Sequence, residues 1–245
     1  GGQPGLPDYP TPRARQTDET FSSALLAEYG EILSRTYWNR VDRENDNPDK
    51  NLHTSIQVRK MGEDASGQLP LGSWGSVHCG AGFELAQAEG NQFDDQEEQS
   101  YWVFLTREFP LQSLPLTFGL GLRGNFYSEF GQAINPELKT TLKQPLYTLQ
   151  FTVNRTNNTP SFLQRYNESS STKPNPDLDM EQATNMSLSV VPKLPEPFSA
   201  SASLFYNMLT DAITYVRGDG GVGRYENAGN VTYKGGEASV TWKLL

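Results

Sequence analysis

Two acidic clusters hold the residues of this 245-residue chain whose types and spacing could bind a cation. The first cluster contains Asp42, Asp46 and Asp49, and the second begins with Asp94 and Asp95. Carboxylate oxygens at close spacing are the ligands that Ca²⁺ prefers in proteins. We therefore take these five aspartates as candidate calcium ligands. The same residues would also suit loops whose negative charges are only solvated, and this alternative stays open.

Catalytic chemistry has no comparable set of residues. His53 and His78 are the only histidines and Cys79 is the only cysteine, so a triad, a disulfide or a thiolate metal site has too few members. The glycine-rich stretch 218–223 lies in a long loop, whereas a phosphate-binding loop joins a strand to a helix. We expect a protein that is not an enzyme and that has no cofactor apart from calcium in its acidic loops.

Charge and composition exclude several further classes. The net charge is −9, whereas a nucleic-acid-binding protein usually carries a basic stripe, so we expect no nucleic-acid partner. Aromatic residues make up 11% of the chain, which is more than a disordered protein would contain. No apolar run reaches the roughly 18 residues that a transmembrane helix needs. What remains is a β protein whose strands have one polar and one apolar face.

Apolar and polar residues alternate with a period of two over most of the chain, which is the pattern of such strands. Between 147 and 153, for example, aromatic or aliphatic residues occupy the odd positions and polar residues the even ones. The same alternation occurs at 52–59, 76–85, 116–123, 199–206 and 237–244. We expect eleven or twelve strands. We also expect long polar loops at roughly 43–51, 61–73, 88–98, 157–180 and 217–229.

Two architectures fit this alternation. In a soluble β-sandwich the apolar faces pack on each other, whereas in a membrane barrel they contact lipid and the polar faces line the lumen. The strands are near ten residues long, which exceeds the usual five or six. Aromatic residues gather near strand ends, as Trp38, Tyr101 and Tyr206 do, and interfacial girdles of barrels place them there. We therefore favour an all-β, antiparallel transmembrane β-barrel and keep a soluble binding module as the alternative.

The barrel interpretation assigns a face to each side chain. The apolar members of every strand, Ile56 and Val58 among them, should contact lipid. Arg123 and Glu237 fall on the polar face and should point into the lumen, because a charge on the lipid face costs about 2–4 kcal/mol at mid-bilayer.

Four segments in a fixed order carry a resemblance to a known family. They read GLRGNFYSEFG at 121–131, NRTNNTPSFL at 154–163 and NPDLDME at 175–181, followed by a hairpin within 204–237 that contains NAGNVTYKGGE. Together they resemble the β-barrel of TonB-dependent outer-membrane receptors, and they are most similar to those for cobalamin and siderophores. Met180 departs from the pattern, because the family has a proline there.

The resemblance implies a receptor or transporter barrel in the outer membrane of a Gram-negative bacterium, in contact with outer-membrane lipid. It implies uptake of a siderophore- or cobalamin-like ligand that is captured by long outer loops. The aromatic, amide and basic residues of those loops are then candidate ligand contacts: Phe162, Gln164, Arg165, Tyr166 and Tyr225.

The departures from the family define the expected domain organisation. Family members have a twenty-two-stranded barrel, an N-terminal plug domain and a short segment that engages TonB. Residues 1–245 contain neither a recognisable plug nor the last strands, so we expect one partial outer-membrane barrel domain with no plug domain. TonB would be a partner only if a plug domain exists elsewhere.

An incomplete barrel raises a second functional hypothesis. An open sheet in lipid exposes the backbone N–H and C=O groups of its edge strands, which is unfavourable. Another chain could complete the barrel. The alternative function is therefore a plugless or split barrel that acts as a structural subunit or a passive pore in an outer-membrane assembly.

Overall fold

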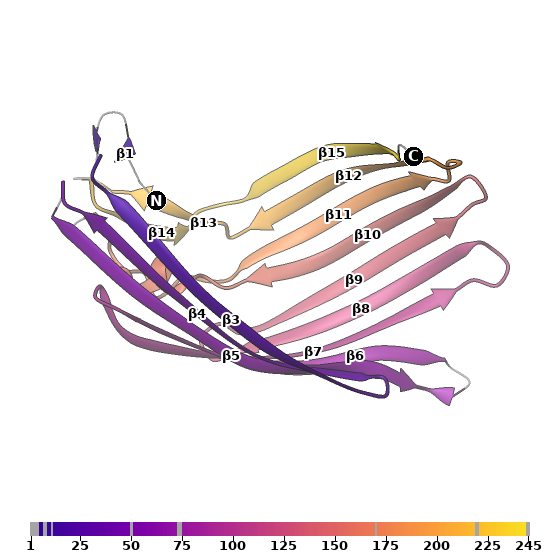
Figure 1. Ribbon diagram of the computed structural model, residues 1–245, viewed down its shortest axis with the longest axis horizontal. Coiled ribbons are helices and arrows are strands. Elements are labelled where there is room, and N and C mark those ends of the chain that lie inside the picture. The colour runs from indigo at the N-terminus through magenta and orange to yellow at the C-terminus, as the bar shows by residue number, and fades with distance from the viewer. Residues whose placement is uncertain are drawn as a thin grey trace.

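The described chain forms one large antiparallel sheet that curves into an open trough (Figure 1). The computed structural model describes residues 5–6, 9–10, 12–49, 51–72, 75–169, 171–218 and 221–243. Within them the sheet has eleven strands, in the order β15-β12-β11-β10-β9-β8-β7-β6-β5-β4-β3. Each strand therefore pairs with its neighbour in the sequence, except where a small hairpin separates β12 from β15. Both the fold class and the expected number of strands are confirmed.

The strands of the large sheet differ in length, and the first five are the longest. They are β3 (Arg15–Tyr29), β4 (Ile32–Asn47), β5 (Leu52–Pro70), β6 (Ser76–Gly90), β7 (Phe93–Pro110), β8 (Leu116–Tyr127), β9 (Gly131–Lys143), β10 (Tyr147–Asn158), β11 (Glu181–Pro192), β12 (Phe198–Thr210) and β15 (Val231–Trp242). Two small hairpins are formed by β1 (Gly5–Leu6) with β2 (Tyr9–Pro10) and by β13 (Ile213–Arg217) with β14 (Gly223–Asn227). A single turn of helix, α1 (Phe162–Tyr166), follows β10. No helix in the described part of the chain is long and apolar enough to cross a membrane.

The two longest connections lie at the same end of the sheet. At one end, β3 and β4 are joined by Gly30 and Glu31 alone, and Gly30 has the positive φ of 61° that favours glycine. At the other end, 159–180 and 211–230 form two long connections that contain α1 and the β13–β14 hairpin. Barrels of the outer membrane have short inner turns and long outer loops, so we name these the inner end and the outer end.

Three of the expected long loops are wrong. Most of 43–51, 61–73 and 88–98 belongs to β4, β5, β6 and β7, which are 16, 19, 15 and 18 residues long. The expectation rested on polar residues and glycines, which do suit loops. Here, however, their backbone groups pair on both sides, as Gly62 does with Tyr37 and Glu84.

Aromatic residues on the convex face mark the two edges of an apolar belt. On four strands they stand eight residues apart, as Phe21 and Tyr29, Tyr101 and Phe109, Phe118 and Phe126, and Phe198 and Tyr206. Eight residues span about 26 Å along a strand, or about 20 Å of height at a tilt of roughly 35–45°. This height is close to the roughly 25 Å of an outer-membrane apolar band. The belt is therefore the membrane-spanning part of the sheet.

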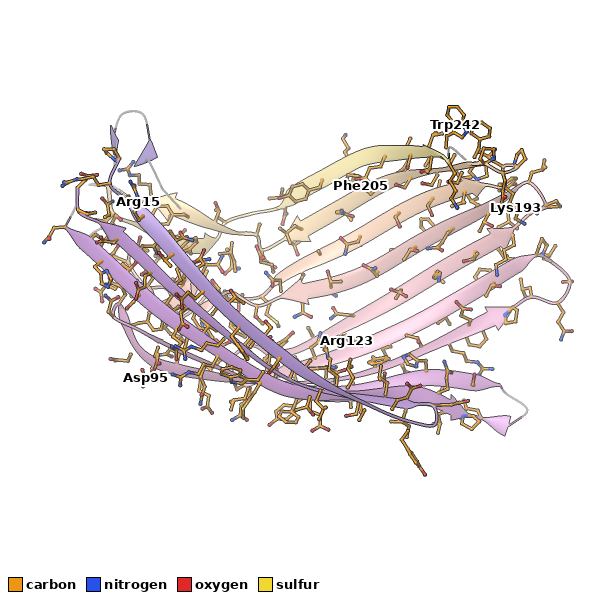
Figure 2. The ribbon with its side chains drawn as sticks, viewed as in Figure 1. Arg15, Asp95, Arg123, Lys193, Phe205 and Trp242 are labelled. Atoms are coloured by element: carbon orange, nitrogen blue, oxygen red, sulfur yellow. The ribbon has the colours of Figure 1, made fainter. Side chains whose placement is uncertain are left out.

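Strand parity confirms the predicted direction of two charged residues and corrects that of two apolar ones. Arg123 and Glu237 lie on the concave face, opposite to Phe126, and Figure 2 shows Arg123 there. Ile56 and Val58 were expected to contact lipid, but they also lie on the concave face. The reason is that they stand beyond the belt, where water surrounds the convex face and a folded loop fills the lumen.

Candidate functional site

The outer parts of β4–β7 reverse the usual polarity of a membrane strand. Their convex face carries ion pairs, with Arg40 Nε 2.8 Å from Asp42 and Arg59 Nη2 2.8 Å from Glu89. Their concave face carries small and branched apolar residues, namely Val41, Ile56, Val58, Ala86 and Ala88. Since water lies outside and a loop inside, the apolar residues turn inward. They provide a floor on which a loop can dock.

The helical turn α1 docks on this floor. Ser161 is its N-cap, and Gln164 completes a capping box in which its backbone N–H donates to Ser161 Oγ over 3.3 Å. Phe162 is 7% exposed and packs with Ala86 and Ala88 in the buried cluster. Fully burying an aromatic side chain of this size contributes about 1.5–3 kcal/mol. This contact therefore holds the 159–180 loop inside the barrel mouth.

A buried arginine makes the second attachment of the same loop. Arg165 is 3% exposed and its guanidinium forms ion pairs with Glu98 and, over 3.7 Å, with Glu129. The rings of Phe130 and Tyr166 lie 4.7 and 4.6 Å from its Cζ atom, which adds two cation–π contacts. Arg165 Nε is buried and has no hydrogen-bond partner.

Burial also affects the acid partner of Arg165. Glu98 stands three residues beyond Tyr101, so it lies outside the membrane-spanning belt. Burial raises the pKa of Glu98 above its ordinary value, although the Arg165 charge opposes this shift. Desolvation therefore opposes the Glu98–Arg165 ion pair, and the other contacts of the loop must offset this cost.

The two long outer loops are joined to each other. The Asn175 backbone N–H donates to the Arg165 carbonyl over 2.7 Å, and the Asn175 side chain donates to the Tyr225 carbonyl over 2.7 Å. The Asp179 backbone N–H donates to Asn227 Oδ1 over 2.9 Å. The 159–180 loop and the β13–β14 hairpin therefore form one cap, and Arg165 attaches this cap to the sheet.

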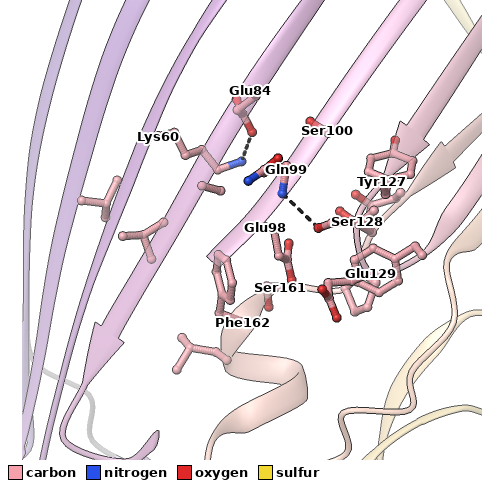
Figure 3. A pocket seen from close by; sticks show the side chains of 18 of the residues that line it. Lys60, Glu84, Glu98, Gln99, Ser100, Tyr127, Ser128, Glu129, Ser161 and Phe162 are labelled. Carbon is pink, nitrogen blue, oxygen red and sulfur yellow. Dashed lines mark hydrogen bonds and ion pairs between the residues drawn. The ribbon is translucent and has the colours of Figure 1, made fainter. Parts of the chain in front are cut away.

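A cavity of about 410 Å³ lies between the cap and the concave wall (Figure 3). Val41, Ile56 and Val58 form its wall, and Phe162 and Leu163 close it from the loop side. Its charged rim contains Arg43, Lys60, Glu84, Glu98 and Glu129. The volume falls within the roughly 300–1,000 Å³ of small-molecule sites, and apolar walls with a few charged groups are typical of them.

A second hollow of about 480 Å³ lies deeper in the lumen, and its lining includes four asparagines and two arginines. Asn157 Oδ1 accepts from Asn125 over 2.9 Å and from Asn135 over 2.7 Å, and Asn157 Nδ2 donates to the Tyr127 hydroxyl over 2.8 Å. Arg123 Nε donates to Asn125 over 2.8 Å. This network keeps the inner wall rigid and polar below the cavity.

The predicted ligand residues are placed unequally. Phe162, Gln164, Arg165 and Tyr166 come together in α1, and Tyr225 joins them only through Asn175. In the structure these residues hold the cap in place, so their role as ligand contacts stays a prediction. The sequence did not single out Glu129, and Glu98 fell within the expected polar loop at 88–98. Their pairing with Arg165 joins residues far apart in the sequence, 67 residues for Glu98, which no local motif reveals.

Two of the five candidate calcium ligands, Asp42 and Asp49, form ion pairs with arginines. Asp42 pairs with Arg40, and Asp49 accepts from Arg13 Nε over 2.6 Å, while Asp46 stands opposite Arg15 in the register. The Arg13 N–H groups hold the pKa of Asp49 below its ordinary value. In the described ranges no three His, Cys, Asp or Glu residues converge as metal ligands. Calcium binding by these residues and by Asp94 and Asp95 therefore stays a prediction.

An eleven-stranded antiparallel sheet with an apolar belt, short inner turns and long outer loops defines part of a large outer-membrane β-barrel. The family model for "TonB dependent receptor-like, beta-barrel" matches residues 7–245, so the chain belongs to this family. Membership confirms the expected location in the outer membrane and the expectation of a non-enzymatic protein.

Solved structures share this fold at low sequence identity. The siderophore receptor PirA from Pseudomonas aeruginosa has a TM-score of 0.73 and 17% identity over 92% of this chain and 46% of its own. A variant of the ferric enterobactin receptor PfeA from the same organism has a TM-score of 0.71 and 16% identity, covering 95% and 42%. The FrpB iron transporter from Neisseria meningitidis has a TM-score of 0.72 and 12% identity, covering 94% and 42%. The chain thus spans less than half the length of each, and no curated protein matches it.

Proposed function

We propose that this chain is the barrel wall of a receptor that takes up an iron–siderophore complex across the outer membrane of a Gram-negative bacterium. The observation that carries the proposal is the cavity at the outer end, because it joins an apolar wall, a charged rim and a folded cap where a ligand would enter. The names of the three solved neighbours, two siderophore receptors and an iron transporter, favour iron over cobalamin as the cargo. TonB is the energy-coupling partner of such a receptor when a plug domain accompanies the barrel.

The geometry suggests how the wall contributes to uptake. The cap narrows the outer mouth, and the cavity beside the docked Phe162 holds the ligand against the concave wall. The polar network around Asn157 then offers hydrogen-bonding groups further down the lumen. A ligand that leaves the cavity therefore meets a hydrated path, while the apolar belt on the convex face stays in lipid.

A second function is favoured by the edges of the sheet. Strands β3 and β15 each have one neighbour in the described sheet, so each leaves one row of backbone groups to be paired within the membrane. Strands from the same polypeptide or from another chain can complete the barrel. If another chain does so and no plug fills the lumen, the assembly is a passive pore or a structural subunit.

Uptake of radioactive iron separates the two functions. Iron-starved cells that produce the complete reading frame are supplied with ferric siderophores, and accumulation is compared with that of cells lacking the gene. The proposal expects uptake that depends on the gene and on TonB. Uptake that persists without TonB, together with passage of unrelated solutes of similar size, would instead support the pore, and gene-independent uptake would remove both.

A further inference from the structure

A site for a strongly anionic ligand needs an excess of positive charge, and the outer cavity has no such excess. Two basic residues line the cavity, and each already has an acid partner. Lys60 Nζ lies 2.9 Å from Glu84, and Arg43 Nε lies 2.7 Å from Asp18. The positive charge of each cation is therefore already offset by a neighbouring carboxylate, which weakens its attraction for an anionic ligand.

The remaining carboxylates of the rim share one cation between them. Glu98 and Glu129 both pair with Arg165, and Arg165 stands behind the cavity lining. The Glu129 side chain is 44% exposed and lies 3.7 Å from the guanidinium, so it is the more weakly held of the two. The seven charges of this region, which are Asp18, Arg43, Lys60, Glu84, Glu98, Glu129 and Arg165, sum to −1 because four are acidic and three basic. The excess negative charge lies at the rim near Glu129.

The opposite wall of the same cavity is apolar. Val41, Ile56 and Val58 lie on the concave face, and Phe162 faces them from the cap. A ligand that fits both walls has an apolar body and a group that a carboxylate attracts. A binding site gains specificity both from contacts that attract the right ligand and from like charges that repel the wrong one.

From these contacts, and resting on the proposed function, we infer that the cavity selects ferric siderophores that carry a protonated amine over anionic ferric catecholates. The ammonium group lies at Glu129 and the apolar chain of the siderophore lies against Val41, Ile56 and Val58. This selectivity can differ from that of the ferric enterobactin receptor that shares the fold. The shared fold leaves room for this difference, because the identity is only 16%.

The test compares three ferric complexes on outer membranes from cells that produce the complete reading frame. The first is a linear trihydroxamate complex with a free terminal ammonium group. The second is the same complex after N-acetylation, which removes one positive charge and leaves the iron centre unchanged. The third is an anionic tris-catecholate complex. We expect the ammonium complex to bind on the order of tenfold more tightly than its acetylated form, and the catecholate to bind most weakly.

Two matched substitutions test whether the carboxylate at the cavity rim causes this order of affinities. Glu129→Gln removes the weakly held charge from an exposed turn and should abolish most of the preference for the ammonium complex while leaving the acetylated complex nearly unaffected. Glu31→Gln makes the same chemical change in the β3–β4 turn at the inner end and should leave all three affinities unchanged. Circular dichroism of both variants checks that the sheet is intact.

Each outcome decides a different question. Equal affinity for the ammonium and acetylated complexes, tightest binding of the catecholate, or a preference that survives Glu129→Gln would overturn the inferred charge selectivity while leaving siderophore uptake in place. Failure of all three complexes to bind or to deliver iron would remove the proposed function and this inference with it.

Discussion

The same strands follow opposite rules in the membrane belt and at the outer end. Inside the belt, apolar side chains such as Leu122 face outward and Arg123 faces the lumen. Beyond the belt on β5, Ile56 and Val58 face inward, and Arg59 stands on the convex face between them and the belt. The same antiparallel sheet runs through both regions from β4 to β7, with one register shift between Ala88 and Gly90.

The difference shows that the surrounding medium decides which face is apolar. Strand geometry determines only that alternate residues share a face. Whether lipid or water lies outside the sheet determines which face is apolar. At the outer end the apolar face is available for a loop to dock, and the cap uses it. The predictions that follow test whether the two regions are held by different interactions.

The largest effect is expected when the cap loses its buried charge. Arg165→Ala leaves Glu98 without its cation partner, and breaking a buried ion pair costs about 3–5 kcal/mol. Because Asn175 joins the loop to the β13–β14 hairpin, both outer loops should lose amide protection together while the belt strands stay protected. Hydrogen exchange measured by mass spectrometry reports each segment separately.

A second arginine of the same cap provides the control. Arg224 pairs with Glu226 over 2.8 Å, but its side chain is 54% exposed, so Arg224→Ala should cost less than about 1 kcal/mol. If Arg165→Ala changed exchange no more than Arg224→Ala, Arg165 would not be the attachment point of the cap.

The contrast between the membrane belt and the outer end also explains which features the sequence predicts. The period-two pattern predicts strands, their number and the direction of Arg123, because alternation is a local property. It does not predict where a strand leaves the bilayer, and so Ile56 and Val58 were assigned to lipid and 43–47 to a loop. In the candidate site, the aromatic and basic residues of α1 stand out in the sequence, but Glu98 and Glu129 do not. Their contact with Arg165 arises from register between segments far apart in the chain.

The apolar attachment of the cap should give the next largest effect. Phe162→Ala removes a buried ring from its contact with Ala86 and Ala88, which costs about 3 kcal/mol. Exchange in the 159–169 segment should rise, and the affinity for a siderophore should fall because the cavity loses one wall. Phe126→Ala deletes the same ring from the convex face, where the cap has no contact, and should leave cap exchange unchanged.

A lysine placed on the convex face tests where the membrane belt ends. Leu122 stands midway between Phe118 and Phe126, so Leu122→Lys puts a charge near mid-belt and should cost about 2–4 kcal/mol. Thr17→Lys places the same charge on the convex face of β3, four residues beyond Phe21, and should cost little. Denaturant unfolding in lipid vesicles measures both, and equal costs would show that the belt is drawn in the wrong place.

The smallest effect concerns pH and the cap. Burial holds the pKa of Glu98 above its ordinary value of 4.5, so the docked cap binds a proton more tightly than the released cap does. Above this raised pKa the Glu98 carboxylate is ionised and its burial opposes docking of the cap. Docking should therefore become stronger as the pH falls through the raised pKa and the carboxylate takes up a proton. Asp49 has a pKa lowered by Arg13, so the stabilisation of the β4–β5 turn should be lost only as the pH falls through a value below 3.8.

Amide exchange of 159–169, corrected for the intrinsic exchange rate at each pH, measures the docking of the cap between neutral pH and pH 4.5. Glu98→Gln keeps the shape of the side chain without its charge and should remove the pH dependence in this window, while exchange in the β4–β5 turn stays constant in both proteins. Weaker docking of the cap at lower pH would mean that the attraction of Arg165 outweighs the burial of Glu98. In that case the Arg165–Glu98 ion pair would itself stabilise the docked cap, and it would not depend on the packing of Phe162 to offset its desolvation.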